Sequence, residues 1–241
     1  MQMTEERDLL NFVRQINADI RDLASGGSVD GAVDFKENVF TRLVQDWFAE
    51  TGVVENPEVC YYEARVGRGM AKANGFGVND DEDTLDIFTS IFHDTAGIVS
   101  VPKEEISKAA RRAARFLEAA TQGLHKNMET ASDAYAMASR IYELTDRLER
   151  VRIFIITDGR APMKMITNLI VRQIPVSFEI WDLERLCRSM HSGLPHAAIE
   201  IDFEKISGRA LPCLPMPEQA SDYMAYLING RNQPSAMHDR Q

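Results

Sequence analysis

The chain has 241 residues, of which 27 are Lys or Arg and 37 are Asp or Glu, so its formal net charge is −10. With 44% hydrophobic and 27% charged residues it has the composition of an ordinary globular protein, long enough to bury a core without disulfides or a structural metal. It has no apolar run of membrane-spanning length and no secretory or transit signal, and its acidity argues against a protein that mainly binds phosphate backbones.

The beginning of the chain predicts two amphipathic helices. Apolar residues recur at three- and four-residue spacings over about 5–24 and over about 34–50, which is the pattern of one buried face on each helix. Ser25-Gly26-Gly27-Ser28 ends the first helix, and Asp34 is placed to cap the second.

Three strands are predicted next, at 59–66, 70–78 and 85–92. The first and third are rich in β-branched and aromatic residues, and the middle one is weaker. Because Gly67-Arg68-Gly69 and the acidic segment 79–83 separate them, they are expected to form a meander. The acidic segment lacks the alternating ligands and the turn glycine of a calcium loop, so it is interpreted as a solvated turn.

The second half of the chain alternates helices and strands. The predicted elements are a helix from Pro102 to about Gly123, a helix over 131–150, a strand over 151–157, a short segment over 166–171 that is compatible with helix, a strand over 176–180, a helix over 181–190 capped by Asp182, and a strand over 198–203.

This order predicts an α/β fold, with a mixed sheet flanked by helices. No Pro-, Ser- or Gly-rich linker divides the chain before its last part. Residues 1–203 are therefore expected to form a single nuclease-like α/β domain, and 204–241 a Pro-rich extension with a frayed tail. A short terminal element is compatible with 223–228.

The order helix, three strands, helix, strand is that of a metal-dependent nuclease core. Such a core needs an acid at the end of the second strand, and an acid and a Lys two residues apart on the third, to hold Mg²⁺ and to orient a water. Here Asn74 stands in place of the first acid and Phe88 in place of the Lys, so that only Asp86 remains.

The candidate catalytic residues are therefore Asp86, Glu37, Asn74 and Lys72, with Glu63 as a further support. Under this hypothesis Mg²⁺ is the cofactor. The favoured alternative is an architectural strand on which Asp86 faces solvent, with no cofactor. The five histidines show no metal-binding spacing, so no metal site is predicted.

The helix that begins after Pro102 carries the single concentrated basic face of the sequence, formed by Lys108, Arg111, Arg112 and Arg115. Residues 103–115 hold five basic and two acidic residues, a net charge of +3. This face is a candidate for binding nucleic acid or an acidic protein partner. A solvated helix face is the favoured alternative.

Asp158 follows the apolar strand over 151–157. Acids at the carboxyl ends of parallel strands often line ligand crevices. Asp-Gly is also a common pair in tight turns, and the turn is the favoured interpretation of Asp158-Gly159. The three widely spaced cysteines, Cys60, Cys187 and Cys213, indicate reduced thiols in a cytoplasmic protein.

Three phrases of the sequence are similar to a known family. The segment from Asn74-Gly75-Phe76-Gly77 through Leu85-Asp86-Ile87-Phe88, the strand that ends in Thr157-Asp158-Gly159, and the phrase Phe178-Glu179-Ile180-Trp181-Asp182-Leu183-Glu184-Arg185-Leu186 together resemble the amino-terminal region of bacterial abortive-infection phage-resistance (AIPR-type) proteins. The resemblance spans roughly 5–227.

The resemblance implies a cytoplasmic protein of antiviral defence with a restriction-endonuclease-like fold. The chain departs from an active nuclease at Asn74 and Phe88. Family members usually continue into a larger carboxyl-terminal region, so the chain is expected to be a fragment, a truncated product or a stand-alone relative.

Three hypotheses stay open. The first is an interaction or sensing domain without catalysis, whose partner is another protein or the missing carboxyl-terminal region. The second is a metal-dependent nuclease that cleaves DNA or RNA around Asp86. The third is an oligomerisation module.

Overall fold

In a computed structural model the chain divides into two units, residues 1–197 and 198–241. The residues that the structure describes are 2–26, 36–162, 166–192, 213–215 and 224–226.

In the described part of the first unit, helices flank a mixed sheet, which confirms the α/β fold. The helices are α1 (Gln2–Gly26), α2 (Lys36–Glu50), α3 (Lys103–Thr121), the 3₁₀ turn η1 (Leu124–Asn127), α4 (Asp133–Leu144) and α5 (Leu183–Ser192). The strands are β1 (Pro57–Val66), β2 (Gly69–Val78), β3 (Thr84–Ile91), β4 (Arg150–Thr157), β5 (Leu169–Val171) and β6 (Ile174–Trp181).

The described strands form one sheet in the order β1-β2-β3-β4-β6-β5. The pairs β1–β2 and β2–β3 are antiparallel, as the predicted meander requires, and the acidic segment 79–83 is the turn between β2 and β3. Strands β3, β4 and β6 run parallel, and β5 returns antiparallel along the edge of β6.

Two predicted elements differ from the structure. The helix expected over 131–150 ends at Leu144, where the backbone N–H groups of Arg147 and Leu148 bond to the Leu144 carbonyl and turn the chain toward β4. The segment 166–171 was compatible with helix, but its last three residues form strand β5.

Strand β5 forms because the chain makes a tight hairpin with β6. Arg172 and Gln173 connect the two strands with φ values of 47° and 71°. Positive φ at both central residues matches the right-handed twist of a hairpin, but Gly and Asn usually provide it. The sequence therefore carried no turn signal at this point.

The second unit is described only in part. Its described residues are two short strands, β7 (Cys213–Pro215) and β8 (Met224–Tyr226), which pair antiparallel. The strand expected over 198–203 lies outside the described residues, as does most of the segment 204–241. The expected boundary at residue 203 stays a prediction.

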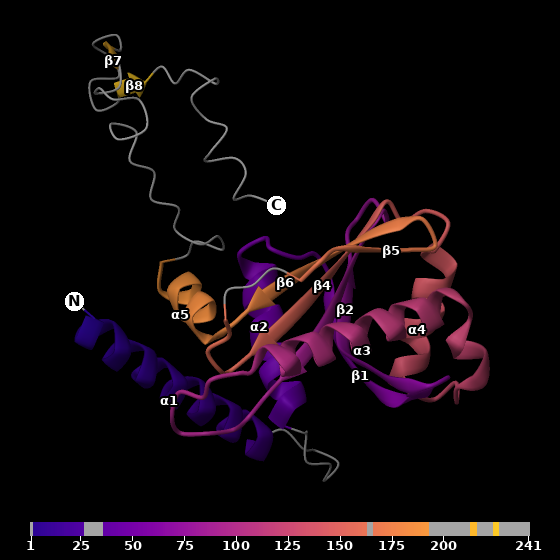
Figure 1. The fold of residues 1–241 in the computed structure, drawn as a ribbon, viewed down its shortest axis with the longest axis horizontal. Helices are drawn as coiled ribbons and strands as arrows, with labels where there is room; N and C mark the ends of the chain where they lie inside the picture. Colours follow the sequence, from indigo (N-terminus) through magenta and orange to yellow (C-terminus); the bar gives the residue numbers. More distant parts are fainter. Residues whose placement is uncertain (1, 27–35, 163–165, 193–212, 216–223, 227–241) are drawn as a thin grey trace. The chain divides into compact units, whose positions relative to one another are not determined.

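Each face of the sheet has its own apolar cluster. On one face, β2, β3 and β4 pack against α3 and α4, and the small residues Ala110 and Ala113 let α3 approach the strands closely. On the other face, α1, α2 and α5 cover an aromatic group that includes Phe48, Phe88 and Trp181. Figure 1 shows α3 and α4 on one side of the strands and α2 crossing on the other.

Gly75 lies where the β2–β3 pairing ends and β1 makes an irregular step between Val59 and Tyr62. A Cβ atom at this glycine would lie 2.5 Å from the carbonyl oxygen of Glu58, which is backbone and cannot move aside cheaply. We expect Gly75→Ala to lower the free energy of unfolding by about 1–3 kcal/mol, as overpacking of a core does, in urea unfolding monitored by circular dichroism.

Gly97→Ala is the matched control, because no atom lies within 4 Å of the added methyl group and its φ is not in the left-handed region. We expect this variant to stay within about 0.5 kcal/mol of the parent. Equal losses in the two variants would contradict the close approach of β1 at Gly75.

Candidate functional site

The four candidate catalytic residues lie on the α2 face of the sheet but form two separate groups. Glu37 in the first turn of α2 meets Lys72 and Asn74 of β2 near the end of β3. Asp86, near the beginning of β3, is paired instead with Arg152 of β4.

The first group, called here the Glu37 cluster, consists of Glu37, Lys72, Asn74 and Ser90. Lys72 Nζ forms an ion pair with Glu37 Oε1, and the same oxygen accepts a hydrogen bond of 3.1 Å from Asn74 Nδ2. Asn74 is fully buried, and its Oδ1 accepts a 2.9 Å hydrogen bond from the backbone N–H of Ser90. Lys72 Nζ also donates to the Ser90 carbonyl at 3.1 Å.

The Glu37 cluster replaces backbone pairing between two strands. The described β2–β3 register ends at Gly75 and Phe88. Beyond that point the side chains of Asn74 and Lys72 satisfy the backbone N–H and carbonyl of Ser90, groups that a continuing ladder would have paired. These polar side chains therefore have a structural role: they join β2 to β3 beyond the point where the backbone ladder ends.

In the second group Asp86 is held by two parallel hydrogen bonds. Arg152 Nε donates to Oδ1 and Arg152 Nη2 to Oδ2, both at 2.6 Å. The guanidinium also donates to the carbonyl of Val53 at 3.1 Å and lies over the ring of Phe154. This is the bidentate geometry in which arginine binds a carboxylate most strongly.

The alternative in which Asp86 faces solvent is wrong, because the residue is only 3% exposed. Burial raises the pKa of Asp86, while the bonded Arg152 guanidinium acts in the opposite direction. Burial lowers the pKa of Arg152, but the hydrogen bonds and the charge of Asp86 together with nearby carboxylates outweigh this effect and raise it. The pair is a buried charge pair in which each partner depends on the other.

Phe88 separates the two groups. Its ring stacks on Phe154 with centroids 5.1 Å apart and also contacts Phe48. The residue that occupies the place of the nuclease lysine is thus part of the aromatic core. Four residues along a strand span about 13 Å, so Asp86 and Ser90 of the Glu37 cluster are too far apart to share one metal ion.

A magnesium ion does not fit these residues. Mg²⁺ requires oxygen ligands at about 2.0–2.1 Å in octahedral geometry, usually including free carboxylates. Both oxygens of Asp86 are taken by Arg152, one oxygen of Glu37 is taken by Lys72 and Asn74, and Asn74 brings no charge. Among the described residues, no group of three or more His, Cys, Asp or Glu is placed to hold a metal.

The basic residues of α3 differ in their surroundings and in their partners. Lys108 is exposed, while Arg112 Nη1 pairs with Glu63 of β1 at 3.0 Å. Arg115 Nη1 donates to the Met70 carbonyl at 2.9 Å. Glu63, a predicted support for Asp86, is thus paired with Arg112 of α3 instead.

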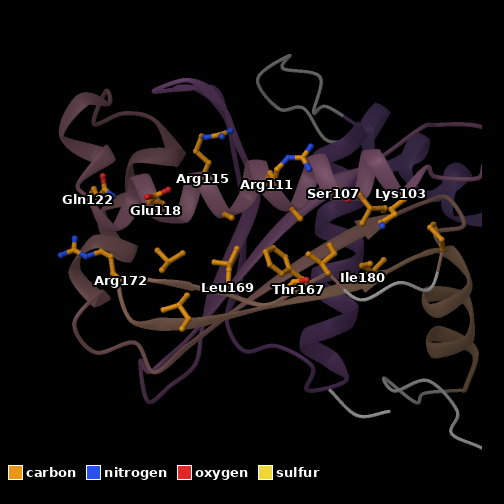
Figure 2. A pocket seen from close by; sticks show the side chains of 18 residues that line it. Lys103, Ser107, Arg111, Arg115, Glu118, Gln122, Thr167, Leu169, Arg172 and Ile180 are labelled. Carbon is orange, nitrogen blue, oxygen red and sulfur yellow. The ribbon is translucent and has the colours of Figure 1, made fainter. Parts of the chain in front are cut away.

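Arg111 and Arg115 also line a groove between α3 and the strands β5 and β6 (Figure 2). Its volume is about 720 Å³. The apolar lining includes Ile166, Leu169 and Phe178. We call this feature the α3 groove; its sequence signal was only the basic stripe on the helix, because β5 was not predicted.

Asp158, after β4, occupies a third polar site. Its side chain is buried and accepts hydrogen bonds from the backbone N–H groups of His93 and Asp94 and from His93 Nδ1. It therefore ties the loop after β3 to the end of β4. Asp182 accepts a hydrogen bond from the backbone N–H of Arg185 at 3.0 Å, so its predicted capping role in α5 is confirmed.

Arg152 is a site residue that no sequence motif singled out. A lone arginine inside the apolar run 151–157 was a signal of buried charge. Its partner was not visible, since the Asp86–Arg152 contact joins residues 66 positions apart through the β3–β4 register.

Within the part of the chain that the structure describes, no helix has the length and apolar character needed to cross a bilayer. A family model described as "Abortive infection phage resistance protein N-terminal domain" matches residues 40–188. This range includes β1 to β6 and most of both polar groups. The comparisons with curated proteins and with solved structures gave no match.

Proposed function

Because the chain belongs to the abortive infection phage resistance protein N-terminal domain family, we propose that it serves anti-phage defence in the cytoplasm as an interaction or sensing domain. In this proposal its core is nuclease-like in fold and has no catalysis of its own. Its partner is another protein or a larger carboxyl-terminal region that follows this domain in family members.

One observation supports the proposal most: basic side chains of the protein itself bind the candidate catalytic carboxylates. Asp86 is bound through both oxygens by Arg152, and Glu37 is bound by Lys72. Phe88 fills the space between them with an aromatic ring. A fold carries an activity only through its site, and these side chains support the strands rather than form an open metal centre.

A cleavage assay tests the absence of catalysis. The purified chain is incubated with double-stranded DNA, single-stranded DNA and single-stranded RNA, in Mg²⁺, in Mn²⁺ and in EDTA. We expect every substrate to stay uncut in all three conditions, because both oxygens of Asp86 and one oxygen of Glu37 are already bound by side chains of the protein.

Asp86→Asn tests the alternative, a metal-dependent nuclease centred on Asp86. The matched control is Asp81→Asn, which makes the same chemical change in the exposed turn between β2 and β3. Metal-dependent cleavage that is lost in Asp86→Asn and kept in Asp81→Asn would refute the proposal and establish the nuclease.

A further inference from the structure

The α3 groove lies over a part of the sheet that no helix of the described chain covers. Parallel strands are usually joined by a crossover helix that covers the sheet. Strands β4 and β6 are parallel, yet the described residues of their connection contain strand β5 and no helix. As a result Phe178 and Ile180 of β6 stay only half-buried beside α3.

The side of α3 that borders the groove carries small residues. Ser107, Ala110 and Ala114 face it, so the helix leaves a hollow against the larger Phe178 and Ile180. On the strand side Ile170 of β5 is 75% exposed. The groove thus combines an apolar floor with strand β5, the edge strand of the described sheet, which pairs with β6 on one side only.

The groove is long rather than compact. Its lining follows α3 from Lys103 to Gln122, and Figure 2 shows these residues at opposite ends, with Arg172 beside Gln122. At 1.5 Å per residue this stretch of helix spans about 28 Å. That length suits a helix of about 18 residues better than a compact small molecule.

The net positive charge of the groove favours an acidic partner. Among its described lining residues, the basic ones are Lys103, Arg111, Arg115 and Arg172, against the single acid Glu118. Arg115 and Arg172 are held by hydrogen bonds to the carbonyls of Met70 and Thr121. The side chains of Lys103 and Arg111 make no hydrogen bond or ion pair within the described chain, although the whole chain carries −10.

We propose that the α3 groove binds an acidic amphipathic helix of a partner protein, which lies beside α3 in the place that a crossover helix would occupy. This inference rests on the proposed interaction function and names the surface and the chemistry of its partner. The apolar face of the bound helix covers Phe178 and Ile180, and its acidic flank faces Arg111 and Lys103.

Synthetic peptides test the proposal with the full chain. The probe is a fluorescein-labelled peptide of about 18 residues, with Leu at helical i, i+3, i+4 and i+7 spacing and Glu on the flanks. One comparison peptide has the same composition with the Leu residues scrambled, and another has Lys in place of Glu. Fluorescence anisotropy is measured for each, and for a labelled single-stranded RNA.

We expect saturable binding of the acidic amphipathic peptide and at least tenfold weaker binding of both comparison peptides. Arg111→Glu should lower the affinity for the acidic peptide about tenfold, since it reverses a charge at the rim of the groove. Lys108→Glu is the matched control: it makes an equal charge change on the same helix, is exposed and does not line the groove. It should change the affinity less than twofold.

Ala114→Trp is a second variant, which places a large ring in the groove and should abolish binding. The proposal is wrong if the acidic peptide does not bind, if the scrambled peptide binds equally well, or if Arg111→Glu and Lys108→Glu have equal effects. Binding of the RNA without the peptide would assign the groove to a polyanion instead.

The two proposals fail in different ways. If the peptide does not bind and no metal-dependent cleavage is seen, the groove is not the partner site, and the proposal of a non-catalytic interaction domain stands. Metal-dependent cleavage that requires Asp86 would refute the proposed function whatever the peptides do.

Discussion

Replacement of Arg152 by methionine should lower the free energy of unfolding by about 3–5 kcal/mol at pH 7, because it leaves the buried carboxylate of Asp86 without its partner. The Asp86 side chain is 5% exposed and loses both of its hydrogen bonds from the guanidinium. Urea unfolding followed by circular dichroism measures the loss, and the slope of the transition shows whether the variant still unfolds in one step.

The loss should depend on pH in a defined direction. Without Arg152, burial acts unopposed by the guanidinium and raises the pKa of Asp86 further. The folded variant then binds more protons than the unfolded chain, whose Asp pKa is about 3.9. The stability that Asp86 contributes to the variant is therefore fully present below that value and is lost as the pH rises through the raised folded pKa. The deficit relative to the parent should accordingly be smaller at pH 5 than at pH 8.

A double replacement separates the charge from the packing. Asp86→Leu in combination with Arg152→Met removes both charges and should recover most of the stability, since a buried ion pair can often be replaced by apolar residues at little cost. A single Arg152→Met variant as stable as the parent at pH 7, or a deficit that grows on acidification, would show that Asp86 is not a buried, paired carboxylate.

The second large effect is expected from Asn74→Asp, which restores the acid of the nuclease pattern. The amide Nδ2 that donates to Glu37 at 3.1 Å becomes an oxygen, so two carboxylates face each other at a fully buried position. We expect a loss of about 2–3 kcal/mol at pH 7, which the neighbouring Lys72 offsets only in part.

The new carboxyl group should have a raised pKa, because burial and Glu37 both disfavour its charge. Stability is then lost as the pH rises, and thermal unfolding at pH 5 and pH 8 measures the difference. Asn127→Asp in the exposed turn η1 is the control and should show neither effect. We also expect no Mg²⁺-dependent cleavage from Asn74→Asp, since Glu37 stays bound to Lys72 and Asp86 lies elsewhere on β3.

The sequence was a good guide to the order of elements and a poor guide to the partners of individual side chains. Helical periodicity located α1 to α3, and runs of β-branched and aromatic residues separated by turn segments located the meander, because both patterns are local. The Asp86–Arg152 pair was not accessible in this way, since it depends on which residues of β3 and β4 lie side by side.

The same holds for the register of the nuclease pattern. The nuclease pattern grouped Asn74 with Asp86 and Phe88, yet the β3 residue whose backbone bonds to the Asn74 side chain is Ser90. The Asn74 side chain bonds to Ser90 because the β2–β3 ladder ends at Gly75 and Phe88, which leaves the backbone of Ser90 to be paired by side chains. Strand β5 was missed for a related reason, since its hairpin uses Arg172 and Gln173 where a turn signal would be Gly or Asn.

The most direct test of the central claim is a calorimetric titration of the purified chain with Mn²⁺, which occupies the same oxygen sites as Mg²⁺. We predict no saturable binding in the parent, because both candidate carboxylates are neutralised within the fold. Saturable binding that is lost in Asp86→Asn or Glu37→Gln, and retained in Asp81→Asn, would contradict this conclusion and support the metal-dependent nuclease instead.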